Sequence, residues 1–276
     1  SPEDEVVYRK AMANALTVLK NNQAILPVKN IEDKKIAYVE LGDDSGAPFY
    51  IGLQKYAKVT KIEAASASDY VNKLADFNYV IIGFHRSNDN PWKSYKFTVR
   101  EVGIIEAIAA AKPTVLDVFV RPYALFDLKN TTNLEGVVMS YQNSTIAQDL
   151  SAQLIFGAIE AKGKLPVSVG TDFKINTSYE TGTLRRLKYG IPEEEGMDSQ
   201  KLNSIEGLMK EGLTDVMFPG AQVLVARHGK VIYEKAFGYH TYTKKQPVQL
   251  DDVYDLASMT KILATLPLLM KRYDEG

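Results

Sequence analysis

The stretch Tyr79-Val80-Ile81-Ile82-Gly83-Phe84 carries apolar side chains at consecutive rather than alternate positions. Val115-Leu116 repeats this pattern farther along the chain. A strand with one face in water alternates between apolar and polar residues, whereas a strand covered on both faces does not. These two stretches therefore predict strands that are buried on both faces, as in a parallel sheet.

Strand-like and helix-like segments alternate through the first 170 residues. We expect strands at Ile36 to Leu41, Val59 to Ile62, Tyr79 to Phe84, Thr114 to Val120 and Gly136 to Met139. Helical patterns lie near residues 46–56, 68–75, 98–111 and 144–160. A first helix begins at Ser1-Pro2 and carries Val6, Val7, Met12, Leu16 and Leu19. This alternation predicts an α/β fold, a three-layer αβα sandwich with a mainly parallel sheet.

The patterning divides the chain into three parts. The strand–helix alternation covers residues 1–170, and residues 171–196 are polar and lack periodicity, which is typical of a connecting segment. Residues 197–276 begin with Asp198, a favourable helix cap, followed by apolar residues at helical spacing and two β-rich runs that predict a hairpin. We expect this last part to be an incomplete α+β unit.

Composition and charge limit the classes of protein to which the chain can belong. It has 276 residues, 45% of them hydrophobic and 24% charged, with a formal net charge of −1. That balance gives no reason to expect nucleic acid or an anionic membrane as a partner, and no apolar run approaches the roughly 18 residues of a membrane span. The absence of cysteine excludes disulfides and thiolate metal sites. It fits a cytoplasm or a bacterial periplasm, and we favour the periplasm or cell envelope.

The segment Asp255-Leu256-Ala257-Ser258-Met259-Thr260-Lys261 contains the one Ser-x-x-Lys of the chain. It lies where an extended run changes to a helical pattern, and residues three apart share a face in the first helical turn. The Ser258 hydroxyl can therefore meet the Lys261 amine, which can take its proton as the serine attacks a carbonyl carbon. The alternative is a solvated serine and lysine without chemistry. Pro267, farther into the same helix, removes one backbone hydrogen bond and predicts a bend.

Several motifs around this segment resemble the N-terminal part of the serine β-lactamase and penicillin-binding-protein family. The matching text is Pro219-Gly220-Ala221, Val225-Ala226-Arg227-His228-Gly229-Lys230, Phe237-Gly238-Tyr239 and Leu256 to Lys261. The resemblance implies that Ser258 is the acylated nucleophile and Lys261 its proton acceptor. The Tyr-x-Asn and Lys-Thr-Gly or His-x-Gly motifs of that family follow the Ser-x-x-Lys, but only fifteen residues follow Lys261. We therefore expect a hydrolase domain whose C-terminal remainder is missing.

Motifs at both ends of the first domain carry a second resemblance. Near its start stand Ala15-Leu16-Thr17-Val18-Leu19-Lys20-Asn21-Asn22 and Ile25-Leu26-Pro27-Val28. Near its end stand Leu154-Ile155-Phe156-Gly157 and Gly163-Lys164-Leu165-Pro166-Val167-Ser168-Val169. These motifs make residues 1–170 similar to the C-terminal domain of glycoside hydrolase family 3, which implies a glycosidase.

The loop after the strand at Tyr79–Phe84 separates two branches of that family. In the β-glucosidase branch this loop holds the glutamate acid/base, but here residues 85–93 contain no glutamate. The chain resembles the β-N-acetylhexosaminidase branch better, in which the catalytic groups lie on a preceding barrel. A retaining glycosidase needs two carboxyl groups about 5 Å apart, and this chain offers no convincing pair. We therefore expect a missing N-terminal barrel domain.

His85, Arg86 and Trp92 are candidate substrate-binding residues. His85 and Arg86 follow a central strand, at the edge where parallel sheets bind ligands, and Trp92 could stack on a sugar. The alternatives are polar loop residues without a ligand and a tryptophan that packs in a domain interface.

Metal and cofactor sites are not expected. His228 lies in the hairpin turn and His240 beyond its second strand, and neither has a third ligand nearby. The loop Gly42-Asp43-Asp44-Ser45-Gly46 is not a dinucleotide-binding fingerprint, and its two acids would repel a pyrophosphate.

Together these patterns predict a fragment of a bacterial two-enzyme fusion. One enzyme would be a family 3 β-N-acetylglucosaminidase and the other a β-lactamase-like serine hydrolase, which suggests a carbohydrate or muropeptide substrate and cell-wall turnover. The chain begins at Ser1 with no initiator methionine, and we expect it to be inactive alone. The alternative is that residues 1–170 form a non-catalytic carbohydrate-binding or domain-docking module.

Overall fold

The computed structural model describes residues 1–87 and 92–276. The chain forms two compact units, of which the first comprises Ser1–Met197 with Arg227–Val231. The second comprises Asp198–Ala226 and Ile232–Gly276. Within the described residues, no helix is both long enough and apolar enough to cross a bilayer.

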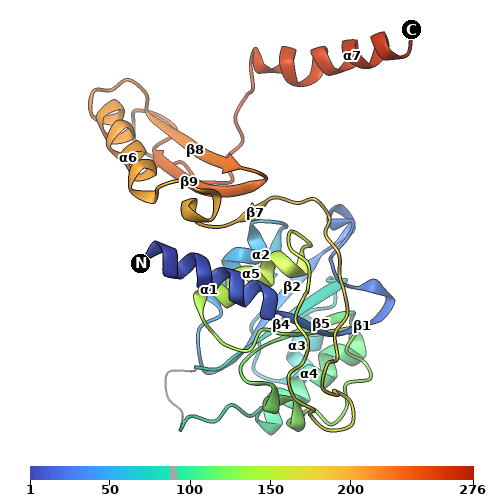
Figure 1. Cartoon of the computed structure of the whole chain (residues 1–276). Coiled ribbons are helices and arrows are strands. Elements are labelled where there is room, and N and C mark those ends of the chain that lie inside the picture. The colour runs from blue at the N-terminus through green and yellow to red at the C-terminus, as the bar shows by residue number, and fades with distance from the viewer. Residues whose placement is uncertain (88–91) are drawn as a thin grey trace. The chain divides into compact units, whose positions relative to one another are not determined.

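A six-stranded sheet forms the centre of the first unit (Figure 1). Its strands are β1 (Thr17–Asn21), β2 (Ile36–Gly42), β3 (Val59–Lys61), β4 (Tyr79–His85), β5 (Thr114–Phe119) and β6 (Gly136–Met139). The spatial order is β1-β6-β5-β4-β2-β3, and every neighbouring pair is parallel except β1 with β6. The predicted α/β fold with a mainly parallel sheet is therefore confirmed.

Helices cover both faces of this sheet. They are α1 (Pro2–Ala15), α2 (Ala47–Gln54), α3 (Ala67–Lys73), α4 (Val99–Ala111) and α5 (Thr145–Ile155), with short 3₁₀ turns at Asn22–Ala24, Ile31–Asp33, Pro122–Asp127 and Pro192–Glu195. Val80 and Ile82 of β4 pack in one core cluster with α3 and α4, whereas Ile81 packs in a second cluster with α1, α2 and α5. The unbroken apolar stretch is explained by this burial on both faces.

The first helix is shorter than its sequence pattern predicts. We expected Leu16 and Leu19 on this helix, but α1 ends at Ala15. Leu16 has extended backbone directly before β1, and Leu19 lies within β1. Leu16 packs in one core cluster and Leu19 in the other. Four consecutive buried residues, 16–19, can face two layers from a strand but cannot all face one core from a helix.

The segment after the sheet runs along the first unit and is held there by backbone acceptors. The amide of Tyr179 donates to the carbonyl of Val18 at 2.9 Å, and the Leu184 amide donates to Gly157 at 2.8 Å. Strand β7 (Lys188–Tyr189) then pairs in parallel with Lys230 and Val231. This polar stretch thus obtains its hydrogen bonds from surrounding structure rather than from its own periodicity.

The second unit contains α6 (Ser199–Thr214), most of β8 (Gly220–Arg227) and of β9 (Lys230–Gly238), and a C-terminal helical segment. Asp198 caps α6 by accepting hydrogen bonds from the amides of Gln200 and Lys201. The C-terminal segment is a π-helical turn, Lys261–Thr265, followed by α7 (Leu266–Asp274). Pro267 explains the π turn, because proline removes an amide donor and its ring crowds the carbonyl four residues earlier.

Candidate functional site

The structure brings Ser258 and Lys261 together at the start of the C-terminal helical segment. The Lys261 amine Nζ donates a hydrogen bond to Ser258 Oγ across 3.2 Å. The preceding residue, Ala257, has a positive φ of 44°, which is uncommon for a residue with a side chain. Its amide donates to the Asp255 carboxylate at 2.9 Å, so this carboxylate supports the tight turn that presents Ser258.

Both side chains of this pair are exposed, as are all residues from Val253 to Gly276. The hydroxyl and the amine are placed for a proton transfer during attack on a carbonyl carbon. Preorganised donors in a water-excluded pocket contribute most of the stabilisation in acyl transfer. The exposed pair by itself therefore offers a hydroxyl beside an amine, but not the enclosure that efficient acyl transfer needs, so the roles predicted for Ser258 and Lys261 remain predictions.

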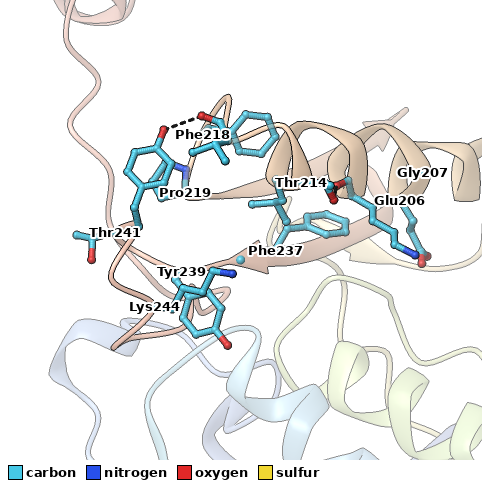
Figure 2. A pocket seen from close by; sticks show the side chains of 14 residues that line it. Glu206, Gly207, Thr214, Phe218, Pro219, Phe237, Tyr239, Thr241 and Lys244 are labelled. Carbon is cyan, nitrogen blue, oxygen red and sulfur yellow. Dashed lines mark hydrogen bonds between the residues drawn. The ribbon is translucent and has the colours of Figure 1, made fainter.

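A groove of about 860 Å³ lies elsewhere in the second unit, between α6 and the end of β9 (Figure 2). Its walls include Leu213, Phe218 and Phe237, with Glu206 and Lys210 from one face of α6. Neither Ser258 nor Lys261 lines it. The groove is thus separate from the predicted nucleophile.

In the first unit, His85 lies at the point where the strand order changes direction. Strand β3 lies on one side of β2 and β4 on the other, so the carboxyl ends of β2 and β4 meet at the position where other α/β sheets have a ligand-binding crevice. His85 ends β4 opposite Gly42, but its side chain is fully buried. A Cβ added to Gly46 or to Gly83 would come within 2.5 Å of His85 Nε2. The crevice is therefore filled by side chains of the protein itself.

Hydrogen bonds fix the tautomer of His85. Asn143 Nδ2 donates to Asp44 and to the Ser45 carbonyl, so its Oδ1 faces His85 Nδ1 at 2.7 Å. Nδ1 must therefore carry the proton, and the free Nε2 accepts from the Tyr38 hydroxyl at 2.9 Å. Burial lowers the pKa of His85 to about 4. The imidazole is thus neutral at physiological pH.

Arg86 is also engaged inside the first unit. Its Nη2 donates to both carboxylate oxygens of Glu101, at 3.0 and 2.7 Å, and its Nη1 lies 3.5 Å from Asp43. Trp92, in contrast, is 92% exposed. Residues 88–91, which belong to the loop that lacks a glutamate, lie outside the described residues. The side chains of His85 and Arg86 are buried among other residues of the first unit, and the substrate-binding role predicted for them and for Trp92 remains a prediction.

Asp117 is a titratable residue that the sequence patterns did not single out. It lies fully buried in β5 and accepts hydrogen bonds from Ser140, at 2.7 Å, and from Ser151. Burial raises its pKa to about 7, although the two serine hydroxyls oppose that rise. Its only sequence signal is a lone carboxylate within the apolar run Thr114 to Val120.

The structure thus contains an αβα domain with a mainly parallel sheet, followed by a segment in which Ser258 and Lys261 are hydrogen-bonded. The model of the glycosyl hydrolase family 3 C-terminal domain matches residues 16–202, which is more than half of the chain. The chain therefore belongs to the family of the glycosyl hydrolase family 3 C-terminal domain. The beta-lactamase family model matches residues 205–276. Both predicted resemblances are confirmed.

Solved structures share the fold of the first unit. A fungal multi-domain GH3 beta-N-acetylglucosaminidase is similar with a TM-score of 0.50 at 19% identity, over 64% of this chain and 20% of the other. The beta-glucosidase from Listeria innocua in complex with glucose is similar with a TM-score of 0.50 at 17% identity, over 72% of this chain and 30% of the other. At these identities the likeness concerns the fold alone.

The chain also has relatives by sequence, one of which is a curated bacterial protein. It is a protein of Salmonella enteritidis PT4 that is provisionally named a D-alanyl-D-alanine carboxypeptidase, and it is 34% identical over 100 residues. The match covers 33% of this chain and 22% of the relative. The chain thus spans about a fifth of the length of the curated relatives it matches.

Proposed function

We propose that this chain is part of a hydrolase that joins a family 3 β-N-acetylglucosaminidase to a β-lactamase-like serine hydrolase. The observation that carries the serine hydrolase part is the Ser258–Lys261 hydrogen bond of 3.2 Å at the start of a helical segment. Ser258 Oγ attacks the carbonyl carbon of an ester or amide, and its proton passes to the Lys261 amine, which then gives it to the leaving group. An acyl-enzyme on Ser258 forms as the alcohol or amine leaves, and water then releases the acid.

The substrate class follows from the two parts together. A glucosaminidase removes amino sugars, and a serine hydrolase cuts ester or amide links, so the pair would act on a molecule that contains both. Muropeptides from the bacterial cell wall have this chemistry. The provisional carboxypeptidase name of the Salmonella relative is in line with a peptide substrate.

We further propose that the first unit itself performs no bond cleavage. The crevice at the β2–β4 switch point is filled by His85 and its partners, which favours a docking role for this domain. The glycosidase chemistry would then depend on residues of another domain. This is the second candidate function, a docking module, and it applies to residues 1–170 alone.

The test compares this chain with a longer polypeptide that contains it. We expect the longer polypeptide to hydrolyse p-nitrophenyl N-acetylglucosaminide and p-nitrophenyl acetate, and this chain to hydrolyse neither. Ser258→Ala should abolish the esterase activity and leave the glycosidase activity intact. Ser204→Ala is the matched control, because Ser204 is an exposed serine whose hydroxyl donates to the Lys201 carbonyl within its own helix. Esterase activity that survives Ser258→Ala would overturn the assignment of the nucleophile.

A further inference from the structure

The segment that carries Ser258 has a defined point at which it leaves the folded part of the second unit. The amide of Val248 donates to the carbonyl of Gly238 at 3.1 Å, and the Val248 side chain is only 7% exposed. Val253 is 96% exposed, and the chain stays exposed from there to its end. The half-buried Asp252 is therefore the last anchored residue before the Ser258 turn.

Asp252 forms hydrogen bonds with three residues, His240, Gln249 and Gln222. Its carboxylate oxygen Oδ2 lies 2.6 Å from His240 Nε2 and accepts the amide of Gln249 at 2.7 Å. Its carbonyl accepts from the side chain of Gln222 on β8 at 3.1 Å, and Gln222 also bonds the carbonyl of Gln249. The Gln249 amide and His240 lower the pKa of Asp252, so the carboxylate is ionised at neutral pH.

Residues 249–252 are thus hydrogen-bonded both to β8 and to the residues that follow β9. His240 follows the end of β9, and Gln222 lies in β8, so a shift of residues 249–252 would break hydrogen bonds to both. Hydrogen bonds that involve an ionised carboxylate are stronger than neutral ones. A cavity of about 330 Å³ borders the same contacts and is lined by both His240 and Asp252 as well as Tyr254.

We infer that His240, Asp252 and Gln222 form a clasp that positions the segment carrying Ser258. His240 and Asp252 are positioning residues, because they act through the backbone: the Asp252 carboxylate contacts His240 and the Gln249 amide, whereas Ser258 contacts Lys261. The clasp fixes where residues 253–257 begin and so limits the volume that the Ser258 hydroxyl can sample. Pre-organisation of this kind lowers the cost of reaching the reactive geometry. The functional part of this inference depends on the proposed role of Ser258.

Hydrogen exchange of the whole chain tests the clasp directly. We expect His240→Ala to speed exchange of the hydrogen-bonded amides within residues 249–256 about fivefold, the effect of one lost hydrogen bond of ordinary strength, and Asp252→Ala, which removes two hydrogen bonds, to speed it more. His240→Gln keeps a side-chain donor and should restore much of the protection. His228→Ala is the matched control, because His228 pairs with Glu195 at 2.9 Å but does not contact the Ser258 segment. Circular dichroism verifies that each variant is folded.

A second readout separates the clasp from the proposed function. The same substitutions are made in the longer polypeptide that contains this chain, these proteins are treated with a fluorophosphonate probe, and intact mass gives the rate at which Ser258 is labelled. Slower labelling in the two alanine variants, with recovery in His240→Gln, supports the inference. Unchanged exchange at residues 249–256 overturns it, and so does faster exchange with unchanged labelling. Faster exchange in proteins of which none is labelled would refute the role of Ser258 and leave the anchoring of residues 249–252 supported.

Discussion

Helices α5 and α7 both carry apolar residues at helical spacing, yet α5 is mostly buried and α7 is exposed. Most residues of α5 are buried, including Leu154 and Ile155 with no exposed surface. No residue of α7 is buried, and Leu269 and Met270 are about 60% exposed. An apolar stripe predicts that a helix seeks a partner surface, but only the surrounding structure supplies one.

The reason lies in the layers of the first unit. Helix α5 packs beside α1 and α2 over one face of the sheet, and its side chains join the core cluster of that face. The apolar side chains of α7 remain accessible to water. Helix α5 is therefore stabilised by tertiary packing, whereas α7 depends on its local hydrogen bonds.

The largest expected effect on the free energy of unfolding comes from a comparison in which one leucine of α5 and one leucine of α7 are each replaced by alanine. Leu154→Ala should lower the free energy of unfolding by about 2 to 5 kcal/mol, because it removes buried methyl groups and leaves a cavity. Leu269→Ala should change it by less than about 0.5 kcal/mol, since the side chain already contacts water. Urea unfolding followed by circular dichroism measures both variants. Equal losses in the two variants would mean that α7 is packed in solution.

A smaller effect should appear in the pH dependence of the buried sheet. Burial raises the pKa of Asp117 from 3.8 to about 7, so the folded chain binds a proton between these values that the unfolded chain has released. Asp117 therefore lowers stability as pH rises from about 4 to 7. His85, whose pKa falls from 6.5 to about 4, acts in the opposite sense and lowers stability as pH falls through that range.

Asp117→Asn should separate the contribution of Asp117 to the pH dependence of stability from the opposing contribution of His85. The variant should gain stability relative to the native chain as pH rises from 4.5 to 7.5, by up to a few kcal/mol. Ser151→Ala is the matched comparison, because it keeps the carboxyl and removes a hydrogen bond that lowers its pKa. It should therefore make the fall in stability with rising pH steeper. Urea unfolding at several pH values measures both slopes, and parallel curves for all three proteins would contradict the assignment.

The smallest effect on global stability should come from Pro267. Pro267→Ala restores an amide donor and removes the ring, so residues 261–265 should change from a π turn to regular α-helix. Carbon chemical shifts of residues 259–270 would report this change. The free energy of unfolding should remain within about 0.5 kcal/mol, because α7 is exposed. Unchanged shifts would show that the π turn has another cause.

Prediction from the sequence succeeded where local pattern and burial agree. The strands at 36–41 and 114–120 and the helix at 98–111 were predicted to within one or two residues, because consecutive apolar residues and helical periodicity are local signals. β1 was missed because Leu16 and Leu19 also fit a helical period. Its pairing with β6, more than a hundred residues away, decided between the two.

In the candidate sites, too, features that depend on local spacing were predicted from the sequence, and features that depend on long-range contacts were not. The spacing of Ser258 and Lys261 predicted that the two side chains would meet, because neighbours three apart on a helical turn share a face. No spacing could reveal that His85 would be enclosed by Tyr38 and Asn143, since these residues come together only through the order of the strands. Asp117 escaped prediction for the same reason, because its partners lie on two other elements.

The amino-acid sequence by itself determined the alternation of strands and helices, the family of the first domain and the Ser-x-x-Lys turn. Each of these depends on residues that are near one another along the chain, where sterics and hydrogen bonding act directly. The tertiary structure alone decided that the crevice of the sheet is filled, that Asp117 titrates near neutral pH and that the Ser258 segment begins at a clasp. These features depend on desolvation and on contacts between distant residues, which arise only when the chain has folded.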